Sequence, residues 1–395
     1  MMEAGEHLQH KLQGRLRFLR RFRRTAVGAF TSDNRVTLFQ NGGEFLPALL
    51  DACEAATRFV VLEFYIIRDD HVGRQLAEVL GRIVDHGVRV LLLYDYVGSF
   101  DTPAVYFRSL ERLGISCAVF NPPSVRRGLF WFDRRDHRKI AVIDGEYAFI
   151  CGMNIGDEYA GFGENPQRWR DLGIGVCGPA VAVLHRLFLE NWSEAGGGPT
   201  GCAGEVVEPR PCGDAGVMIV SGGPHQRRSF IHASFRLAIT GATTSVKILN
   251  PYFVPGVRVL RALLRAARRG VKVKLILPSI SDVPLVKLVS RSYLSPLLRA
   301  GVEVYERQGT VLHAKLMFID DHWAIIGSAN LDARSLHRNY EVNTTVDSPT
   351  FARQVMEMFD RDLLQSRRVT LLEHEGRGRL LRLLEFILSP LCRFL

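Results

Sequence analysis

The chain contains one pattern of segments twice. The first copy begins with an apolar run at 59–66, continues through a segment with helical spacing at 72–86, turns at Gly87 and enters another apolar run at 88–94. The second copy keeps this order, with runs at 246–249, 257–269 and 271–277 and a turn at Gly270. A duplication on this scale indicates a fold built from two equivalent units.

The order of segments within each copy predicts the fold class. β-type apolar runs that alternate with amphipathic helices are typical of an α/β layer architecture with a largely parallel sheet. Each copy ends in two more β-type runs around a turn, at 140–143 and 147–150 in the first and at 316–319 and 323–326 in the second. We therefore predict an α/β protein of two pseudosymmetric α/β/α repeats.

The 395 residues suffice for two domains or for one large duplicated unit. A Gly- and Pro-rich stretch at 196–216 has no hydrophobic periodicity and is predicted to link the halves. The sequence then divides into a basic segment at 1–30, a first half at 31–195, a second half at 217–366 and an apolar, basic C-terminal segment at 367–395.

The formal net charge of +10 favours anionic partners such as nucleic acid, acidic lipid headgroups or phosphorylated substrates. Seven cysteines, odd in number and never in Cys-x-x-Cys spacing, argue against a disulfide framework or a zinc site. We therefore expect a reducing compartment, no metal and no cofactor. No secretion signal and no uninterrupted transmembrane span is evident, so any membrane contact is expected to be peripheral.

Both copies carry the motif H-x-K-x4-D at the start of the third β-type run. The motif residues are His137, Lys139 and Asp144, with Asn154 further on, and His313, Lys315 and Asp320, with Ser328 and Asn330 further on. One such motif is moderately specific, whereas two in register within a repeat are a strong signal. We expect both motifs to build a single active site.

This set of side chains suits chemistry at a phosphodiester. The catalyst must neutralise the phosphoryl oxygens, supply a nucleophile and protonate a poor alkoxide leaving group. Two lysines and two asparagines on one phosphate would meet the first demand. Two histidines, with an ordinary pKa of about 6.5, would meet the others if one starts neutral and the other protonated.

The paired motifs resemble the signature of the phospholipase D superfamily, over a duplicated frame that runs from about residue 34 to residue 366. The segments NPYFVPG, RSYL and NLDARS, together with Trp169-Arg170-Asp171, resemble bacterial cardiolipin synthases of the shorter form without N-terminal transmembrane helices. The resemblance implies a phosphohistidine intermediate. We assign His137 as nucleophile and His313 as acid and base.

The resemblance also implies roles for further residues. Nucleophilic histidines need an orienting carboxylate, and we expect Asp171 to hold His137 and Glu341 to hold His313. Asp144 and Asp320 complete the catalytic motifs but are expected to be structural at a strand end. Phosphate binding falls to the set Lys139, Asn154, Lys315, Ser328 and Asn330. The first half departs from the pattern, because Cys151-Gly152 stands where the second half has Gly327-Ser328.

Three apolar and basic segments point to lipid rather than nucleic acid. Leu12, Leu16 and Leu19 recur at helical spacing among arginines, which suits a helix in an anionic membrane interface, although a solvated basic tail is the alternative. Phe130, Trp131 and Phe132 lie in an arginine-flanked insertion before His137 that the second half lacks. A nuclease could use these aromatics to stack bases. The C-terminal segment suits either lipid or a final core helix.

We therefore predict a phosphatidyltransferase. It would move a phosphatidyl group from phosphatidylglycerol, or a related phospholipid, to a second phosphatidylglycerol and release glycerol. The alternatives are a phospholipase D-type hydrolase, a metal-independent nuclease and a membrane-binding scaffold with relic motifs. The expected location is peripheral, on the cytoplasmic face of the bacterial inner membrane. Nucleic acid is not the expected partner, and the sequence does not predict the oligomeric state.

Overall fold

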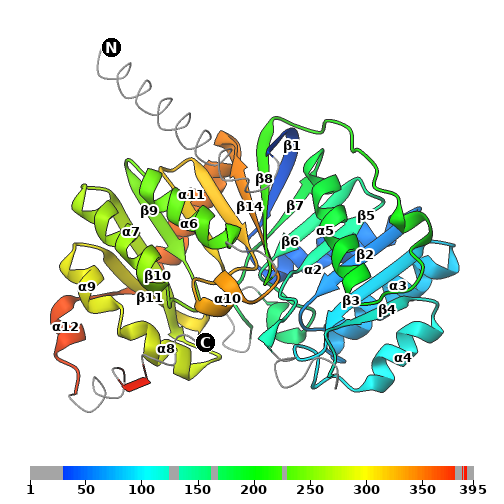
Figure 1. Ribbon diagram of the computed structural model, residues 1–395, viewed down its shortest axis with the longest axis horizontal. Helices are drawn as coiled ribbons and strands as arrows, with labels where there is room; N and C mark the ends of the chain where they lie inside the picture. Colours follow the sequence, from blue (N-terminus) through cyan, green and yellow to red (C-terminus); the bar gives the residue numbers. More distant parts are fainter. Residues whose placement is uncertain are drawn as a thin grey trace.

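The computed structural model describes residues 30–123, 133–161, 168–224, 229–378, 385, 387 and 388. Leu12, Leu16, Leu19 and the aromatic residues Phe130, Trp131 and Phe132, predicted above to contact a membrane, lie outside this range. Within it, the strands form one 15-stranded sheet with helices on both faces (Figure 1).

The strands are, in chain order, β1 (Phe30–Phe39), β2 (Phe59–Phe64), β3 (Arg89–Asp95), β4 (Ser116–Phe120), β5 (Ile140–Ile143), β6 (Tyr147–Cys151), β7 (Gly173–Cys177), β8 (Ala215–Gly222), β9 (Ser245–Leu249), β10 (Lys272–Ile280), β11 (Glu303–Val311), β12 (Leu316–Ile319), β13 (Trp323–Gly327), β14 (Glu341–Asp347) and β15 (Ser366–Val369).

The helices are α2 (Gly42–Glu54), α3 (His71–Asp85), α4 (Ala104–Arg112), α5 (Ala180–Glu194), α6 (Phe230–Gly241), α7 (Gly256–Arg268), α8 (Pro284–Arg291), α9 (Leu294–Arg299), α10 (Ala333–His337), α11 (Pro349–Leu364) and α12 (Leu371–Glu375). Short 3-10 turns span Asp157–Tyr159 and Gly201–Gly204.

The predicted duplication is visible in the strand order. From the central pair β8 and β1, the first half runs outward as β1-β7-β6-β5-β2-β3-β4 and the second as β8-β14-β13-β12-β9-β10-β11. The helices α3 and α7 follow equivalent strands in the two halves, and each ends at a glycine with a left-handed φ of 86°, Gly87 and Gly270. Glycine adopts this conformation without the steric cost that a side chain would bring.

The expectation of a largely parallel sheet was wrong for the middle of the molecule. Parallel pairing is confined to β2-β3-β4 and β9-β10-β11, and the other paired strands of the described sheet are antiparallel. The reason is that β5 and β6, like β12 and β13, are joined by tight turns, which reverse the chain direction.

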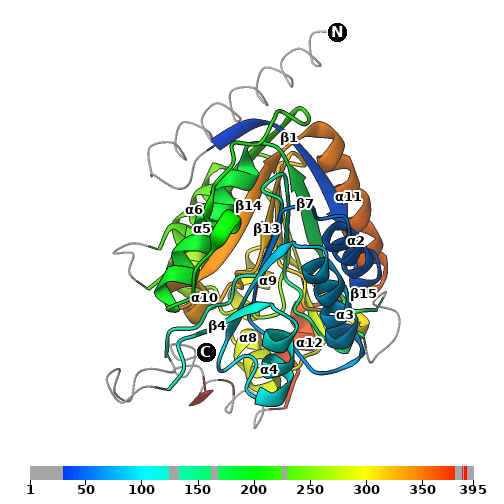
Figure 2. The same ribbon diagram turned by 90° about the vertical axis from the view of Figure 1, so that its right-hand side faces the viewer.

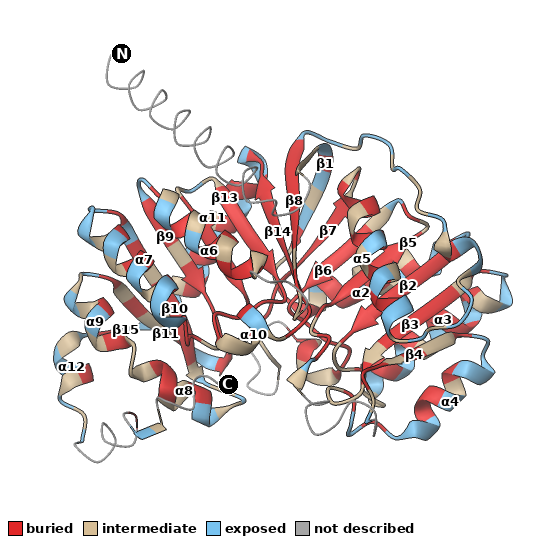
Figure 3. Ribbon diagram, in the orientation of Figure 1, coloured by how far each residue is buried: buried red, intermediate tan, exposed pale blue. Residues whose placement is uncertain are grey.

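The last helix of each half packs across the centre of the sheet. α5 contacts β8 of the second half, and α11 contacts β1 of the first half. Figure 2 shows α5 and α6 on one face and α2, α3 and α11 on the other. Of the central strands, β8, β13 and β14 are buried along most of their length, whereas most of β1 is partly or fully exposed (Figure 3). One hydrophobic cluster joins Ile174 of the first half to Val217 and Ile326 of the second. The halves therefore share a core.

Two of the cysteines are paired. A disulfide joins Cys177 to Cys212, against the prediction of unpaired cysteines. These residues are 35 positions apart but both reach β1: Cys177 pairs with Arg35 in the sheet, and the Cys212 N–H donates to the Asp33 carbonyl.

Among the helices of the described ranges, none combines the length and apolarity needed to cross a membrane.

Candidate active site

The two H-x-K motifs lie in loops that enter β5 and β12 at one edge of the sheet. Each loop pairs its backbone with a segment from the opposite half. The His137 N–H donates to the Tyr340 carbonyl at 2.9 Å, and the His313 N–H donates to the Arg170 carbonyl at 2.8 Å. Isolated parallel bridges, Asp136 with Tyr340 and Arg170 with Leu312, extend this exchange.

As a result, each histidine is paired with a carboxylate of the other half. Nδ1 of His137 lies 3.0 Å from Oε1 of Glu341, and Nδ1 of His313 lies 2.6 Å from Oδ2 of Asp171. The sequence assignment of Asp171 to His137 and of Glu341 to His313 was therefore wrong. That assignment paired each histidine with a carboxylate of its own repeat. In the structure, the backbone of the His137 loop is hydrogen-bonded to Tyr340 of the second half, and Glu341 is the next residue.

The two carboxylates differ in their surroundings. Burial raises the pKa of Glu341 to about 7, although Lys139 and Ser328 act in the opposite direction. Burial also acts to raise the pKa of Asp171, but Lys315 and His313 outweigh it and hold that pKa below its ordinary value. Asp171 is thus a firmly ionised partner, whereas Glu341 is a carboxyl group that can take up a proton near neutral pH.

The difference between Cys151-Gly152 and Gly327-Ser328 has a structural explanation. The Ser328 hydroxyl donates to Oε2 of Glu341 and accepts from the Val342 N–H. A Cβ at Gly152 would lie 2.4 Å from Oδ1 of Asp171. The shorter carboxylate therefore takes the space of the missing hydroxyl. Ser328, predicted to bind phosphate, instead holds Glu341.

The lysines of the motifs are buried. Nζ of Lys139 donates to the His137 carbonyl at 2.7 Å and lies 5.3 Å from the Tyr65 ring centroid. Nζ of Lys315 lies 3.1 Å from Nε2 of His313 and 3.8 Å from Oδ2 of Asp171. Burial lowers the pKa of Lys139 to about 7, although the Glu341 carboxylate acts to raise it. Burial also lowers the pKa of Lys315. An anion near both lysines would raise both pKa values.

The histidines are electrostatically unequal. Burial, with the positive charges of Lys139 and Lys315, holds the pKa of His137 well below its ordinary value. Burial and Lys315 also lower the pKa of His313, but the Asp171 carboxylate acts to raise it. His137 is therefore the histidine that stays neutral, and His313 is the one whose protonated form has an ionised partner.

The asparagines were predicted to bind phosphate. Oδ1 of Asn154 accepts the Ile66 N–H at 3.1 Å and its Nδ2 donates to the Tyr159 hydroxyl at 2.8 Å, so its amide is already engaged. Asn330 is buried, and its Oδ1 has no hydrogen-bond partner within the described residues. A phosphoryl oxygen needs the Nδ2 donor of an asparagine rather than Oδ1, so phosphate binding by Asn154 and Asn330 stays a prediction.

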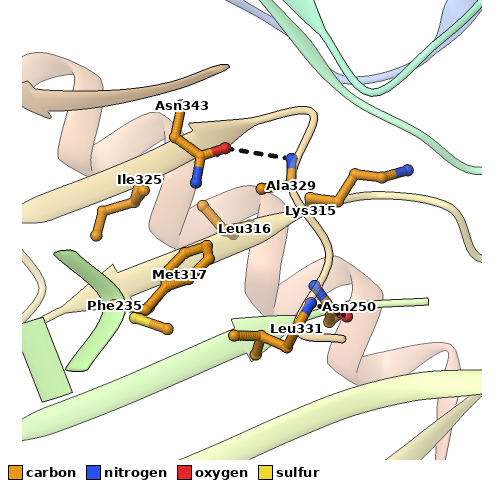
Figure 4. Close-up of a pocket in the computed structure, with 9 residues that line it drawn as sticks. All are labelled: Phe235, Asn250, Lys315, Leu316, Met317, Ile325, Ala329, Leu331 and Asn343. Carbon is orange, nitrogen blue, oxygen red and sulfur yellow. Dashed lines mark hydrogen bonds between the residues drawn. The ribbon is translucent and has the colours of Figure 1, made fainter. Parts of the chain in front are cut away.

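The loop that carries Asn330 is held from both sides (Figure 4). Oδ1 of Asn343 accepts the Ala329 N–H at 3.3 Å, and Oδ1 of Asn250 accepts the Leu331 N–H at 3.2 Å. Lys315 reaches past the small cavity that these residues line. Because Asn343 lies in β14 and Asn250 directly follows β9, the sheet fixes the loop.

Aromatic side chains that the sequence reading did not single out wall the site. The Tyr65 ring centroid lies 5.0 Å from that of His137. The rings of Trp169, Tyr159 and Tyr252 lie 5.2, 5.7 and 6.2 Å from that of His313. The sequence offered one signal, since Trp169 stands beside Asp171. These rings limit the water around the histidines.

A buried ion-pair group holds the segment of Asp171. Arg170 makes two hydrogen bonds to the Asp362 carboxylate, at 3.0 and 2.7 Å, and Nε of Arg307 lies 3.3 Å from the same carboxylate. Arg170 belongs to the first half, whereas Asp362 and Arg307 belong to the second. The group therefore ties the halves together directly beside an orienting carboxylate.

The motif aspartates lie away from this chemistry. Asp144 follows β5, so the whole strand separates it from His137, and its carboxylate accepts the N–H groups of Thr57, Arg58 and Phe59 at 2.8 Å. Asp320 accepts the equivalent N–H groups of residues 243–245. Their proposed role is thus to fix the first residues of β2 and β9. No cluster of three His, Cys, Asp or Glu side chains that could hold a metal ion occurs among the described residues.

The arrangement can act on a phosphodiester. It combines two histidines with unequal electrostatic surroundings, two buried lysines whose charge an anion would stabilise, and carboxylates that fix each imidazole through Nδ1. Such orientation leaves Nε2 of each ring for attack on phosphorus or for proton transfer. The duplicated fold and this paired site define an enzyme suited to act on phosphodiesters.

Comparisons with known proteins narrow the class. Residues 236–363 match the family described as "Cardiolipin synthase, PLD-like domain". The chain is 35% identical over 396 residues to the cardiolipin synthase of Geobacillus sp. (strain WCH70), covering 99% of this chain and 77% of that protein. It is 37% identical over 359 residues to cardiolipin synthase A of Pseudomonas putida, covering 89% and 73%. The chain belongs to the cardiolipin synthase family.

Solved structures agree on the fold. A phosphatidylserine synthase from Haemophilus influenzae Rd KW20 superimposes with a TM-score of 0.70 at 12% identity, covering 95% of this chain and 97% of that one. A polyphosphate kinase from Porphyromonas gingivalis gives 0.57 at 14% identity, covering 90% and 53%. At these identities the likeness concerns the fold alone.

Proposed function

We propose that this protein makes cardiolipin by transferring a phosphatidyl group between two molecules of phosphatidylglycerol through His137. The observation that carries the proposal is the crossed arrangement of two histidine–carboxylate pairs, whose carboxylates differ in pKa. Cardiolipin synthases are the relatives with which the chain aligns over most of its length.

In the first step, Nε2 of His137 attacks phosphorus and the bond from phosphorus to the glycerol oxygen breaks. His313 gives its proton to that oxygen, and glycerol leaves. In the second step, a hydroxyl of another phosphatidylglycerol loses its proton to His313 and attacks phosphorus, and the bond to His137 breaks. Lys139, Lys315 and Asn330 stabilise the phosphoryl oxygens. Each histidine ends as it began.

An acidic rim supports an alcohol as the acceptor. The Tyr252 hydroxyl donates to the Asp282 carboxylate, and Asp282 is exposed. Its charge acts on His313 and Lys315, so it lies near the second histidine. A carboxylate there accepts hydrogen bonds from glycerol hydroxyls.

Exposed apolar side chains near the same edge support a peripheral contact with lipid. Phe100 follows β3 and is 69% exposed, and Ile280 ends the equivalent strand β10 and is 49% exposed. Such residues can enter the interface of a membrane from which the substrate comes. We propose that this membrane is the bacterial inner membrane, reached from its cytoplasmic face.

The test is a product analysis. Purified protein is incubated with phosphatidylglycerol vesicles, and cardiolipin, phosphatidic acid and free glycerol are followed together. We expect cardiolipin and glycerol in equal amounts. Phosphatidic acid without cardiolipin would show a hydrolase, and cleavage of single-stranded DNA without any lipid product would show a nuclease; either result overturns the proposal.

A further inference from the structure

The first half buries three charged side chains where the second half buries apolar ones. Ile140 and Leu316 each lie three residues after a motif histidine. In the sheet, Ile140 pairs with Glu63 and Leu316 pairs with Leu249, so Glu63 and Leu249 hold equivalent positions. Asp136 and Arg138 flank His137. Their equivalents Leu312 and Ala314 flank His313 in the hydrophobic core.

Both carboxyl groups are fully buried, with no exposed surface. Burial, and then the charge of Asp136, raise the pKa of Glu63 well above its ordinary value. Burial raises the pKa of Asp136 as well, although Arg138 acts in the opposite direction. Two interacting buried carboxyl groups resist carrying two negative charges, so we assign Glu63, whose pKa is raised well above its ordinary value, as the neutral donor and Asp136 as the anion.

The hydrogen-bond donor and the positive charges around Glu63 and Asp136 suit a pair that carries one negative charge in total. Nδ2 of Asn191, on α5, donates to Oε1 of Glu63 at 2.8 Å, and Arg138 NH1 lies 4.0 Å from the same oxygen. Lys139 also acts on Asp136. Oε2 of Glu63 and Oδ2 of Asp136 are buried and have no hydrogen-bond partner among the described residues, so each oxygen has room for a shared proton.

The pair is joined to the backbone that carries His137. Oδ1 of Asp136 accepts the Arg138 N–H at 3.3 Å, so the carboxylate spans the histidine. The Asp136 N–H donates to Oδ2 of Asp95 on β3 at 2.9 Å, and Arg135 pairs with Asp95 at 3.2 Å. Asp136 also forms the bridge to Tyr340, the residue before Glu341.

We propose that Glu63 and Asp136 form a carboxyl pair that shares one proton and positions His137 against Glu341. The equivalent apolar residues of the second half show that this fold needs no buried charge at these positions. Burying charged groups costs stability unless they are well paired. The polar set occurs beside the histidine that acts as nucleophile, and this inference uses that proposed role of His137.

The test compares three variants. Glu63→Leu introduces the residue of the second half and removes the proton donor. Glu63→Gln keeps a neutral donor for Asp136 and an acceptor for Asn191. The double variant Glu63→Gln with Asp136→Asn keeps the shape of the pair but removes its negative charge. Arg138 and Lys139 then have no anion at this position.

The first readout is the ring of His137, followed by 15N NMR of histidine-labelled protein and identified by its loss in His137→Gln. We expect one tautomer, protonated at Nδ1, in the native protein and in Glu63→Gln, and a mixture of tautomers in Glu63→Leu. An unchanged His137 signal in Glu63→Leu would overturn the inference, whatever the substrate of the enzyme.

The second readout is cardiolipin formation. We expect kcat to fall at least about tenfold in Glu63→Leu and in the double variant with little change in KM, and Glu63→Gln to regain most of the loss. Equal activity of Glu63→Leu and Glu63→Gln would contradict a positioning role. A native protein that makes no cardiolipin would refute the proposed function alone, because the NMR result stands without it.

Discussion

The imidazole of His137 is held by Glu341, whose Oε1 lies 3.0 Å from Nδ1 although 204 positions of sequence separate the two residues. The equivalent contact joins His313 to Asp171. Neither half therefore contains a complete histidine–carboxylate pair. Catalysis requires both halves in register, and the shared core and the Arg170–Asp362 pair maintain that register.

Removing the charge of either carboxylate should slow the reaction without unfolding the protein. We expect Glu341→Gln and Asp171→Asn each to lower kcat by roughly 10²- to 10⁴-fold, since an oriented imidazole needs the correct tautomer. In addition, His137→Ala with Glu341→Gln should be no slower than His137→Ala alone. Asp360→Asn, an exposed carboxylate on α11, is the control. A further loss in the double variant would contradict the crossed pairing.

Binding of an anion should be coupled to proton uptake. Because burial lowers the pKa of Lys139 to about 7, a fraction of this amine is neutral in the empty site at pH 8. Inorganic phosphate would raise that pKa, so we expect net proton uptake in calorimetric titrations with buffers of different ionisation enthalpy. Lys139→Met should reduce the uptake. Binding without proton uptake in the native protein would show that Lys139 is not at the phosphate.

Stability should fall in mildly acidic solution. The pKa values of His137 and His313 are lowered in the folded state, so the unfolded chain binds these protons more readily. Their contribution to stability is present above the unfolded pKa of about 6.5 and is lost as the pH falls below it, by at most about 1.4 kcal/mol per pH unit for each group. Denaturant unfolding at pH 7 and pH 5 measures this loss. It should be smaller in His137→Gln, and an equal loss would count against a buried, neutral His137.

The motif aspartate Asp144 should matter for stability rather than for chemistry. Asp144→Ala removes the acceptor of three backbone N–H groups and should lower the free energy of unfolding by about 1–3 kcal/mol. Its pKa is lowered because those N–H groups outweigh burial, so this stability is present above about pH 4 and is lost as the pH falls. Loss of kcat in folded Asp144→Ala as large as in His137→Ala would restore a catalytic role.

The buried carboxylate of Asp362 should be a strong determinant of stability. Asp362→Asn leaves the Arg170 and Arg307 guanidinium groups without their shared anion and should cost about 3–5 kcal/mol. Thermal and denaturant unfolding measure the effect, and Asp360→Asn again provides the exposed control on the same helix. Similar stability of the two variants would mean that the buried group does not join the halves.

The repeat and the positions of its paired motifs could be predicted from the sequence because both depend on local patterns. Helical spacing and glycine turns located α3 and α7, and motif spacing located His137 and His313. The partner of each histidine could not be predicted in this way. Sequence order places Asp171 in the same repeat as His137, and only the pairing of β8 with β1 at the centre brings Glu341 to it instead.

Other features depend on three-dimensional contacts that the spacing of residues in the sequence does not reveal. In the sequence, Gly152 in place of a serine looks like the loss of a motif hydroxyl. In the structure, Gly152 lies so close to Asp171 that a serine side chain has no room. The Cys177–Cys212 disulfide forms because both residues meet at β1. The buried Glu63 and Asp136 stand in otherwise apolar surroundings, and their equivalence to Leu249 and Leu312 became clear only from strand register.

The most direct test of the shared site is cardiolipin formation by His137→Ala, by His313→Ala and by a mixture of the two, on phosphatidylglycerol vesicles. Because both histidines serve one site within one chain, each variant should lose at least about 10³-fold in turnover. Mixing the two proteins should restore nothing. Full turnover by either variant would contradict the account.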